Sequence, residues 1–156
     1  AKTIIAVDIS DEKLAIAKKL GATHAVNASK EDPVSKVKEI CGGADYVFDA
    51  SGREATISQA WLATGVQGQL TLVGLLKNGA QLTIDAGPFV NEQSIKGCYF
   101  GSANLQKDVI SLVKSYLSGE LFLDELISER IGLESLNQAV KRLRAGEGAR
   151  NVLVFD

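Results

Sequence analysis

Two kinds of segment alternate along the chain, one short and apolar, the other amphipathic with helical spacing. Residues 3–8 are a nearly continuous apolar run ending at Asp8, as expected for a strand buried on both faces of a parallel sheet. Residues 11–20 follow an N-cap at Ser10 and end at Gly21, as expected for a helix. On these criteria we predict strands at 3–8, 23–26, 44–49, 68–75, 94–100, 126–131 and 151–155, and helices at 11–20, 33–40, 54–63, 104–118 and 134–145.

This alternation indicates an α/β protein. Strands separated by helices of about ten residues are typical of βαβ units, in which the strands run parallel. The helices that connect parallel strands cover the faces of the sheet. We therefore predict a Rossmann-type parallel sheet with helices on both faces, followed by a C-terminal segment of helices and short strands.

The composition narrows the class of protein. The chain has 156 residues, the size of one domain, and its hydrophobic share of 46% excludes a disordered protein. A total of 17 Lys and Arg against 19 Asp and Glu gives a net charge of −2, so we expect no nucleic-acid partner. We see no signal peptide and no apolar run of the roughly 18 residues that span a bilayer, so we expect no membrane association. Cys41 and Cys98 are too far apart for a disulfide framework, which favours a reducing, cytoplasmic location.

Asp8 is the first candidate functional residue. It ends a buried strand and precedes a helix, and in open α/β sheets ligands bind at the carboxyl ends of the strands. A carboxylate there can accept hydrogen bonds from both hydroxyls of an adenosine ribose and repels a 2′-phosphate, which favours NAD over NADP. The same residue also suits a turn or a helix cap, and the sequence leaves both interpretations open.

The glycine-rich loop that normally accompanies such an acid is missing. A dinucleotide fold places Gly-x-Gly-x-x-Gly about 20 residues before the acid, after the first strand. Here only seven residues precede Asp8, and neither Gly42-Gly43 nor Gly52 supplies the pattern. Two hypotheses follow: the chain begins after the phosphate-binding loop, or the site does not bind a dinucleotide.

Several motifs, in order, resemble one known family. Residues 4–9 with Lys13, and then 20–24, 45–52, 72–75, 96–101 and 146–155, are similar to the C-terminal part of medium-chain zinc-type alcohol dehydrogenases. The resemblance covers nearly the whole chain. It implies a partial dinucleotide-binding domain at 1–100 that lacks the first Rossmann strand and the glycine loop. It also implies that residues 101–156 form a segment that packs on the catalytic domain in the full-length family.

The resemblance implies that several residues bind the adenosine half of NAD. Asp8 would bind the adenosine ribose, and Lys13 would reach the same hydroxyls. Ile9 and Ser51 would flank the adenine, although the family often has a larger apolar residue at the position of Ser51. Arg150 would approach the pyrophosphate, where a planar guanidinium suits the geometry of phosphate oxygens.

A second group would bind the nicotinamide half. By the same resemblance Val73, Gly74 and Leu75 would lie near the nicotinamide ring, with backbone groups of Leu75 at its carboxamide. Cys98 and Phe100 would offer backbone groups to the same carboxamide. The resemblance implies no catalytic residue in this chain.

The family's zinc ligands lie upstream of the segments matched here, so the resemblance implies zinc in the complete enzyme and no metal ligand in this chain. The missing first strand is central in the Rossmann order, so its position is empty or is filled by another chain or by a rearranged sheet. In the family the strand before Gly101 often pairs across a dimer, which implies a homo-oligomer.

The leading functional hypothesis is the NAD-binding portion of a zinc-dependent oxidoreductase acting on a small alcohol or aldehyde. One alternative is a non-catalytic nucleotide-binding or interaction module. The other is part of a zinc-free quinone or enoyl reductase. Asp8 argues against this last alternative, because many such enzymes prefer NADP and place small or basic residues at that position.

Overall fold

Residues 5–41 fold into two successive strand–helix units. The computed structural model describes residues 1–155 of the chain. Strand β1 (Ile5–Asp8) leads into helix α1 (Asp11–Lys19), and strand β2 (His24–Asn27) leads into helix α2 (Pro33–Cys41). The two strands pair in parallel, with Asp8 opposite Asn27 at their carboxyl ends. This is the βαβ arrangement predicted from the sequence.

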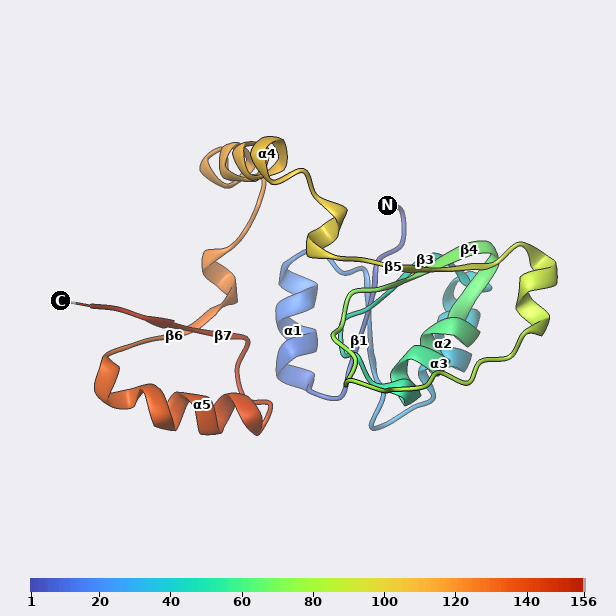
Figure 1. Cartoon of the computed structure of the whole chain (residues 1–156), viewed down its shortest axis with the longest axis horizontal. Coiled ribbons are helices and arrows are strands. Elements are labelled where there is room, and N and C mark those ends of the chain that lie inside the picture. The colour runs from blue at the N-terminus through green and yellow to red at the C-terminus, as the bar shows by residue number, and fades with distance from the viewer. Residues whose placement is uncertain (156) are drawn as a thin grey trace.

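The next segment builds a three-stranded parallel sheet. Strand β3 (Ala44–Asp49) is followed by helix α3 (Glu54–Ala63) and strand β4 (Thr64–Leu72), and strand β5 (Ser94–Gly97) comes after a long connection. The strand order is β3-β4-β5. Helix α1 lies on one side of β1, and α2 and α3 lie on the other (Figure 1). Helices thus lie on both sides of the β1–β2 pair, as predicted, whereas α3 packs on the β3–β4–β5 sheet and leaves Tyr46 and Phe48 of β3 exposed.

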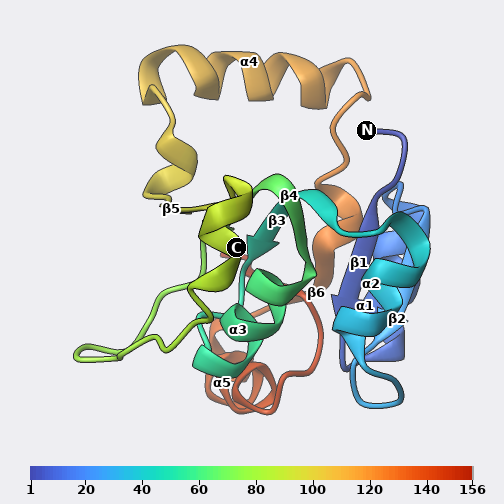
Figure 2. The same ribbon diagram turned by 90° about the vertical axis from the view of Figure 1, so that its right-hand side faces the viewer.

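The C-terminal part has a different character. Helix α4 (Leu105–Leu117) stands away from the rest of the chain in both views (Figures 1 and 2). Strand β6 (Ile127–Ile131), helix α5 (Leu136–Arg144) and strand β7 (Arg150–Leu153) follow, and β6 and β7 form a separate parallel pair. Short 3-10 turns occupy Gly87–Asn91, Phe100–Ser102, Asp124–Leu126 and Leu133–Ser135.

The β1–β2 pair and the β3–β4–β5 sheet are not hydrogen-bonded to each other. In the Rossmann order β2 and β1 would lie on one side of the first strand, and β3, β4 and β5 on the other. Within residues 1–155 no strand joins the two groups. Of the three arrangements considered for the central position, a rearranged sheet that fills it is not observed within the described residues.

The helix starts follow the caps predicted from the sequence. The Ser10 hydroxyl accepts a hydrogen bond from the Lys13 amide at 3.4 Å, and an Asp32 carboxylate oxygen accepts one from the Ser35 amide at 2.8 Å. Gly42 ends α2 in the left-handed conformation, with φ of 76°. These contacts join residues at most four apart, so a local sequence pattern is enough to predict them.

Three strand boundaries differ from the prediction by three residues or more. Strand β4 begins at Thr64 rather than 68, because residues 65–68 bulge out of the pairing with β3 and Gln67 has φ of 58°. It ends at Leu72 rather than 75. Strand β5 ends at Gly97 rather than 100, because the chain turns into a 3-10 segment in which Phe100 has φ of 47°.

The apolar core lies between α3 and the three-stranded sheet. Ile57, Trp61 and Leu70 form its centre and are at most 1% exposed. The Trp61 Nε1–H donates to the carbonyl of Asp85 at 2.7 Å, which satisfies the polar end of the ring. The segment 81–84 forms no strand, yet its Leu82 and Ile84 side chains pack against this core.

Much apolar surface remains uncovered. Helix α4 has no buried residue, and Leu112 and Leu117 on it are 55% and 77% exposed. On β3, Tyr46 and Phe48 are 71% and 66% exposed. Exposed apolar patches of this kind occur at surfaces that contact other proteins, membranes or ligands. No helix among residues 1–155 is both long and apolar enough to cross a membrane.

The Asp32 cap gives a prediction for the pH dependence of stability. Hydrogen bonds from the side chain and amide of Ser35 hold the pKa of Asp32 below its usual value. The stability it contributes is therefore present above the unfolded pKa of about 3.9 and is lost as pH falls through the lower, folded pKa. We expect the stability difference between the wild type and Asp32→Asn to shrink from pH 6 to pH 2.5, measured as urea midpoints. The exposed Asp45, changed to Asn, is the control, and an equal shrinkage there would contradict the assignment.

Candidate functional site

The carboxyl ends of β3, β4 and β5 lie at one edge of the sheet. Asp49 pairs with Leu72, and Leu72 pairs with Gly97, so the three strands end level with one another. The amides of Val73 and Gly74 each donate to the Asp49 carbonyl at 2.8 Å. This register brings together candidates far apart in sequence, namely Ser51, Val73, Gly74, Leu75 and Cys98.

Two loops at this edge touch through their backbones. Gly52 has φ of 65°, and a Cβ there would overlap the carbonyl oxygen of Leu75. A Cβ on Gly74 would overlap the amide nitrogen of Gly52. Glycine is therefore required at both positions. Beside this contact the Leu75 side chain is 92% exposed, and its amide makes no hydrogen bond within residues 1–155.

Asp8 ends β1 with its carboxylate half-buried. One carboxylate oxygen accepts from the Ser10 amide at 2.9 Å, which forms a turn before α1. No donor from residues 1–155 reaches its other oxygen. Ile9, next to it, is 67% exposed. Asp8 thus has the turn role considered from the sequence and also keeps a free acceptor for a ligand hydroxyl.

The neighbouring Asp11 is already paired. Its carboxylate accepts from Lys30 Nζ at 2.6 Å and from Asn27 Nδ2 at 2.7 Å. Hydrogen bonds from Lys30 and then from Asn27 lower the pKa of Asp11, so it stays ionised with both oxygens in use. Of these two acids, Asp8 is therefore the one available to a ligand.

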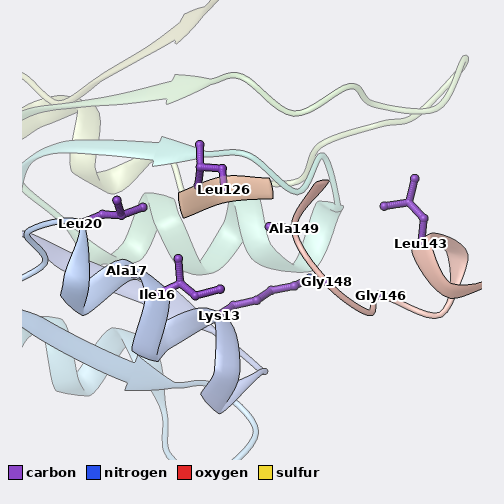
Figure 3. Close-up of a pocket in the computed structure, with 9 residues that line it drawn as sticks. All are labelled: Lys13, Ile16, Ala17, Leu20, Leu126, Leu143, Gly146, Gly148 and Ala149. Atoms are coloured by element: carbon purple, nitrogen blue, oxygen red, sulfur yellow. The ribbon is translucent and has the colours of Figure 1, made fainter. Parts of the chain in front are cut away.

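Lys13 borders a hollow between α1 and the loop before β7. The hollow has a volume of about 370 Å³, and Figure 3 shows Lys13 directed toward the loop at Gly148. Aliphatic side chains of α1, Leu126 and Leu143, and residues of the loop line the rest, and Ala149 of the loop is followed directly by Arg150. The Ser128 hydroxyl accepts from the amides of Ala149 and Arg150 at 2.7 and 3.3 Å. The fold thus places Arg150, an exposed residue, next to the loop that Lys13 borders.

The candidates fall into groups rather than one enclosed pocket. Asp8, Ile9 and Lys13 lie where β1 meets α1, and the second group lies at the edge of the three-stranded sheet. Phe100 lies outside that edge, in a 3-10 turn. It is 70% exposed, and its ring lies edge-on to the ring of Tyr99, with 4.9 Å between the ring centres.

Sequence reasoning did not assign a role to Asp49, which is 5% exposed at the centre of the edge. The signal available was a charged residue at the end of an apolar strand, two positions before Ser51-Gly52.

No metal site is present among the described residues. Within 1–155, no three side chains of His, Cys, Asp and Glu lie close enough to hold a metal ion. Cys41 and Cys98 are both free thiols.

Residues 1–115 match the model of one protein family, described as zinc-binding dehydrogenase. The chain belongs to this family. A curated relative, the NDMA-dependent alcohol dehydrogenase of Amycolatopsis methanolica, is 36% identical over 161 residues, which cover 99% of this chain and 43% of the relative. The S-(hydroxymethyl)glutathione dehydrogenase of Paracoccus denitrificans is 30% identical, covering 99% of this chain and 44% of that protein. The resemblance to zinc-type alcohol dehydrogenases is thereby confirmed.

Solved structures of the family have the same fold. Benzyl alcohol dehydrogenase from Acinetobacter calcoaceticus superposes with a TM-score of 0.95 at 30% identity, over 100% of this chain and 43% of that one. An alcohol dehydrogenase zinc-binding domain protein from Burkholderia ambifaria gives 0.94 at 35% identity, over 100% and 42%. The prediction of a Rossmann-type α/β fold is confirmed. This zinc-binding dehydrogenase chain spans less than half the length of the relatives it matches.

Proposed function

We propose that this chain is the NAD-binding part of an oxidoreductase that acts on an alcohol or aldehyde. The observation that carries the proposal is the free carboxylate oxygen of Asp8 at the carboxyl end of β1. Relatives over nearly the whole chain are named alcohol dehydrogenases, which supports the same class of reaction. When bound, NAD supplies the acceptor or donor of the hydride, and the protein's part is to bind and orient it.

The residues around Asp8 fit the adenosine half of NAD. The two ribose hydroxyls are donors, and the carboxylate, with one oxygen unused, can accept from them. A 2′-phosphate would bring negative charge against this carboxylate, so NAD is favoured over NADP. Lys13 lines the hollow and Arg150 directly follows Ala149, which also lines it, so both would supply positive charge toward the ribose and the pyrophosphate.

The edge of the three-stranded sheet fits the nicotinamide half. The amide of Leu75 is free to donate to a carboxamide oxygen, and Val73, 46% exposed, offers an apolar wall to the ring. Close contact of Gly52 with Gly74 lets main-chain groups, rather than side chains, face the cofactor. We propose that backbone groups of Cys98 at this edge, and of Phe100 in the 3-10 turn beyond it, extend the same wall.

We place the substrate site and the zinc in the rest of a longer polypeptide or in a partner chain. Residues 1–100 are then the partial dinucleotide-binding domain, and residues 101–156 pack on a catalytic domain. The apolar face of α4, with no buried residue, supports such packing. We further propose that the complete protein is a homo-oligomer. The two free thiols of this chain are consistent with a reducing compartment such as the cytoplasm.

One observation favours a second candidate, an interaction module without hydride chemistry. The exposed Tyr46 and Phe48 and the uncovered α4 are surfaces suited to another protein segment. The two candidates differ in whether this chain binds NAD.

Isothermal titration of the chain with NAD and with NADP tests the proposal. We expect NAD to bind, weakly because the glycine-rich loop is missing, and NADP to bind at least about tenfold more weakly, since a 2′-phosphate would face Asp8. No detectable heat with NAD at millimolar concentration would reject nucleotide binding by this chain and leave the interaction module. Equal affinity for NAD and NADP would show that Asp8 does not face the ribose.

A further inference from the structure

Asp49 is a buried carboxylate to which the proposed function assigns no role. It is the last residue of β3 and is 5% exposed. A buried carboxylate is costly unless hydrogen-bond donors surround it. Its contacts therefore show which parts of the structure depend on it.

Donors from the following loop and helix converge on this carboxylate. Its Oδ1 lies 3.0 Å from the Ser51 hydroxyl and 2.9 Å from the Thr56 hydroxyl, and its Oδ2 accepts from the Gly52 amide at 2.8 Å. The Thr56 hydroxyl also lies 2.9 Å from the Arg53 carbonyl, and its single proton can serve one of these acceptors at a time. Arg53 gives α3 no side-chain cap, so Asp49 orders the start of this helix from outside it.

The same residue also contacts the segment after β4. The Asp49 carbonyl accepts from the Val73 and Gly74 amides at 2.8 Å each. Gly52, held by the Asp49 side chain, is packed directly against Gly74 and Leu75. Asp49 therefore fixes the loop after β3 through its side chain and the segment after β4 through its backbone.

We propose that Asp49 is the positioning residue of the cofactor site. Its carboxylate holds Ser51 and Gly52 in the one arrangement that seats Val73, Gly74 and Leu75 against them. This inference rests on the proposed function, because it takes those residues as a wall for NAD. Asp49 itself is 5% exposed and both of its carboxylate oxygens already have hydrogen-bond partners, so it acts through the two segments it joins.

The test uses Asp49→Asn. The side-chain amide has the size of the carboxylate but only one acceptor oxygen. It cannot accept from the Gly52 amide and also from the Ser51 and Thr56 hydroxyls. A matched control is Thr64→Ala, which removes the buried hydroxyl that donates to the Ala60 carbonyl at 2.8 Å, at the opposite end of β4. Both variants lose a buried hydrogen bond in the same three-stranded sheet, but only Asp49→Asn loses it at the proposed site.

Two readouts are compared after thermal midpoints have been measured for both variants. Amide hydrogen exchange by NMR follows Gly52, Val73 and Gly74, and NAD titration follows affinity. Relative to Thr64→Ala, we expect Asp49→Asn to raise the exchange rate of these amides about tenfold and to lower the affinity for NAD about tenfold. Each change is about the size expected when a hydrogen bond to a charged group is lost. A general loss of stability would change both variants alike.

The outcomes separate this inference from the proposed function. The positioning role is overturned if the Val73 and Gly74 amides of Asp49→Asn exchange at the same rate as those of Thr64→Ala. It is also overturned if these amides exchange faster in Asp49→Asn but the two variants bind NAD with equal affinity. If the wild type does not bind NAD, the proposed function fails. Exchange alone then decides whether Asp49 joins the two segments, with faster exchange supporting that link and unchanged exchange overturning it.

Discussion

Replacing Asp8 with asparagine is expected to weaken NAD binding by about 10- to 100-fold. One or two hydrogen bonds from ribose hydroxyls to a carboxylate would be lost or weakened, and bonds to charged groups contribute about 1.5–3 kcal/mol each. The fold should survive, because the asparagine oxygen can still accept from the Ser10 amide that now bonds to Asp8 at 2.9 Å. Isothermal titration with NAD and NADP measures the change. The ratio of the affinity for NAD to that for NADP should fall as well, because asparagine does not repel a 2′-phosphate.

Asp11→Asn is the matched control for this prediction. It removes one negative charge at the same helix start, but from a carboxylate already bonded to Lys30 and Asn27. We expect it to leave NAD affinity within about twofold, since surface charge changes of this kind have small effects. If both substitutions weaken NAD binding equally, the effect comes from the loss of a negative charge and not from a hydrogen bond to Asp8. No weakening by Asp8→Asn would leave Asp8 as a turn residue only.

Replacing Trp61 with alanine is expected to lower the free energy of unfolding by about 3–5 kcal/mol. Trp61 is 1% exposed, packs at the centre of the core and lies 4.9 Å from the ring of Phe89. Its removal leaves a large cavity between α3 and the sheet and an unpaired Asp85 carbonyl. Stabilities of small domains are of the order of 5–15 kcal/mol, so the variant should be largely unfolded in mild denaturant. Urea unfolding followed by circular dichroism measures the loss.

Trp61→Phe separates packing from hydrogen bonding at this position. Phenylalanine keeps most of the buried ring but cannot donate to Asp85, so we expect a smaller loss, about 1–3 kcal/mol. If Trp61→Ala costs less than about 1 kcal/mol, the core of this domain lies elsewhere. If both substitutions cost the same, the hydrogen bond rather than the packing carries the effect.

The amino-acid sequence alone determined the features that depend on neighbours a few residues apart. The helix starts at Ser10 and Asp32 follow from side chains that reach an amide three residues on. The place of Asp8, at the end of an apolar strand and before a helix, is likewise local. From these patterns the α/β class and the position of the candidate ribose-binding acid could both be predicted.

The tertiary structure decided what depends on residues distant in sequence. The bulge that moves the start of β4 to Thr64 coincides with a close backbone contact between Gly43, just before β3, and Gly65 of β4. The strand pairing that aligns Asp49 with Leu72 sets which candidates share an edge. The burial of Asp49 and the packing of Gly52 on Gly74 arise the same way. Such contacts form only when whole elements dock, because the register of two strands depends on how the buried faces of both strands match.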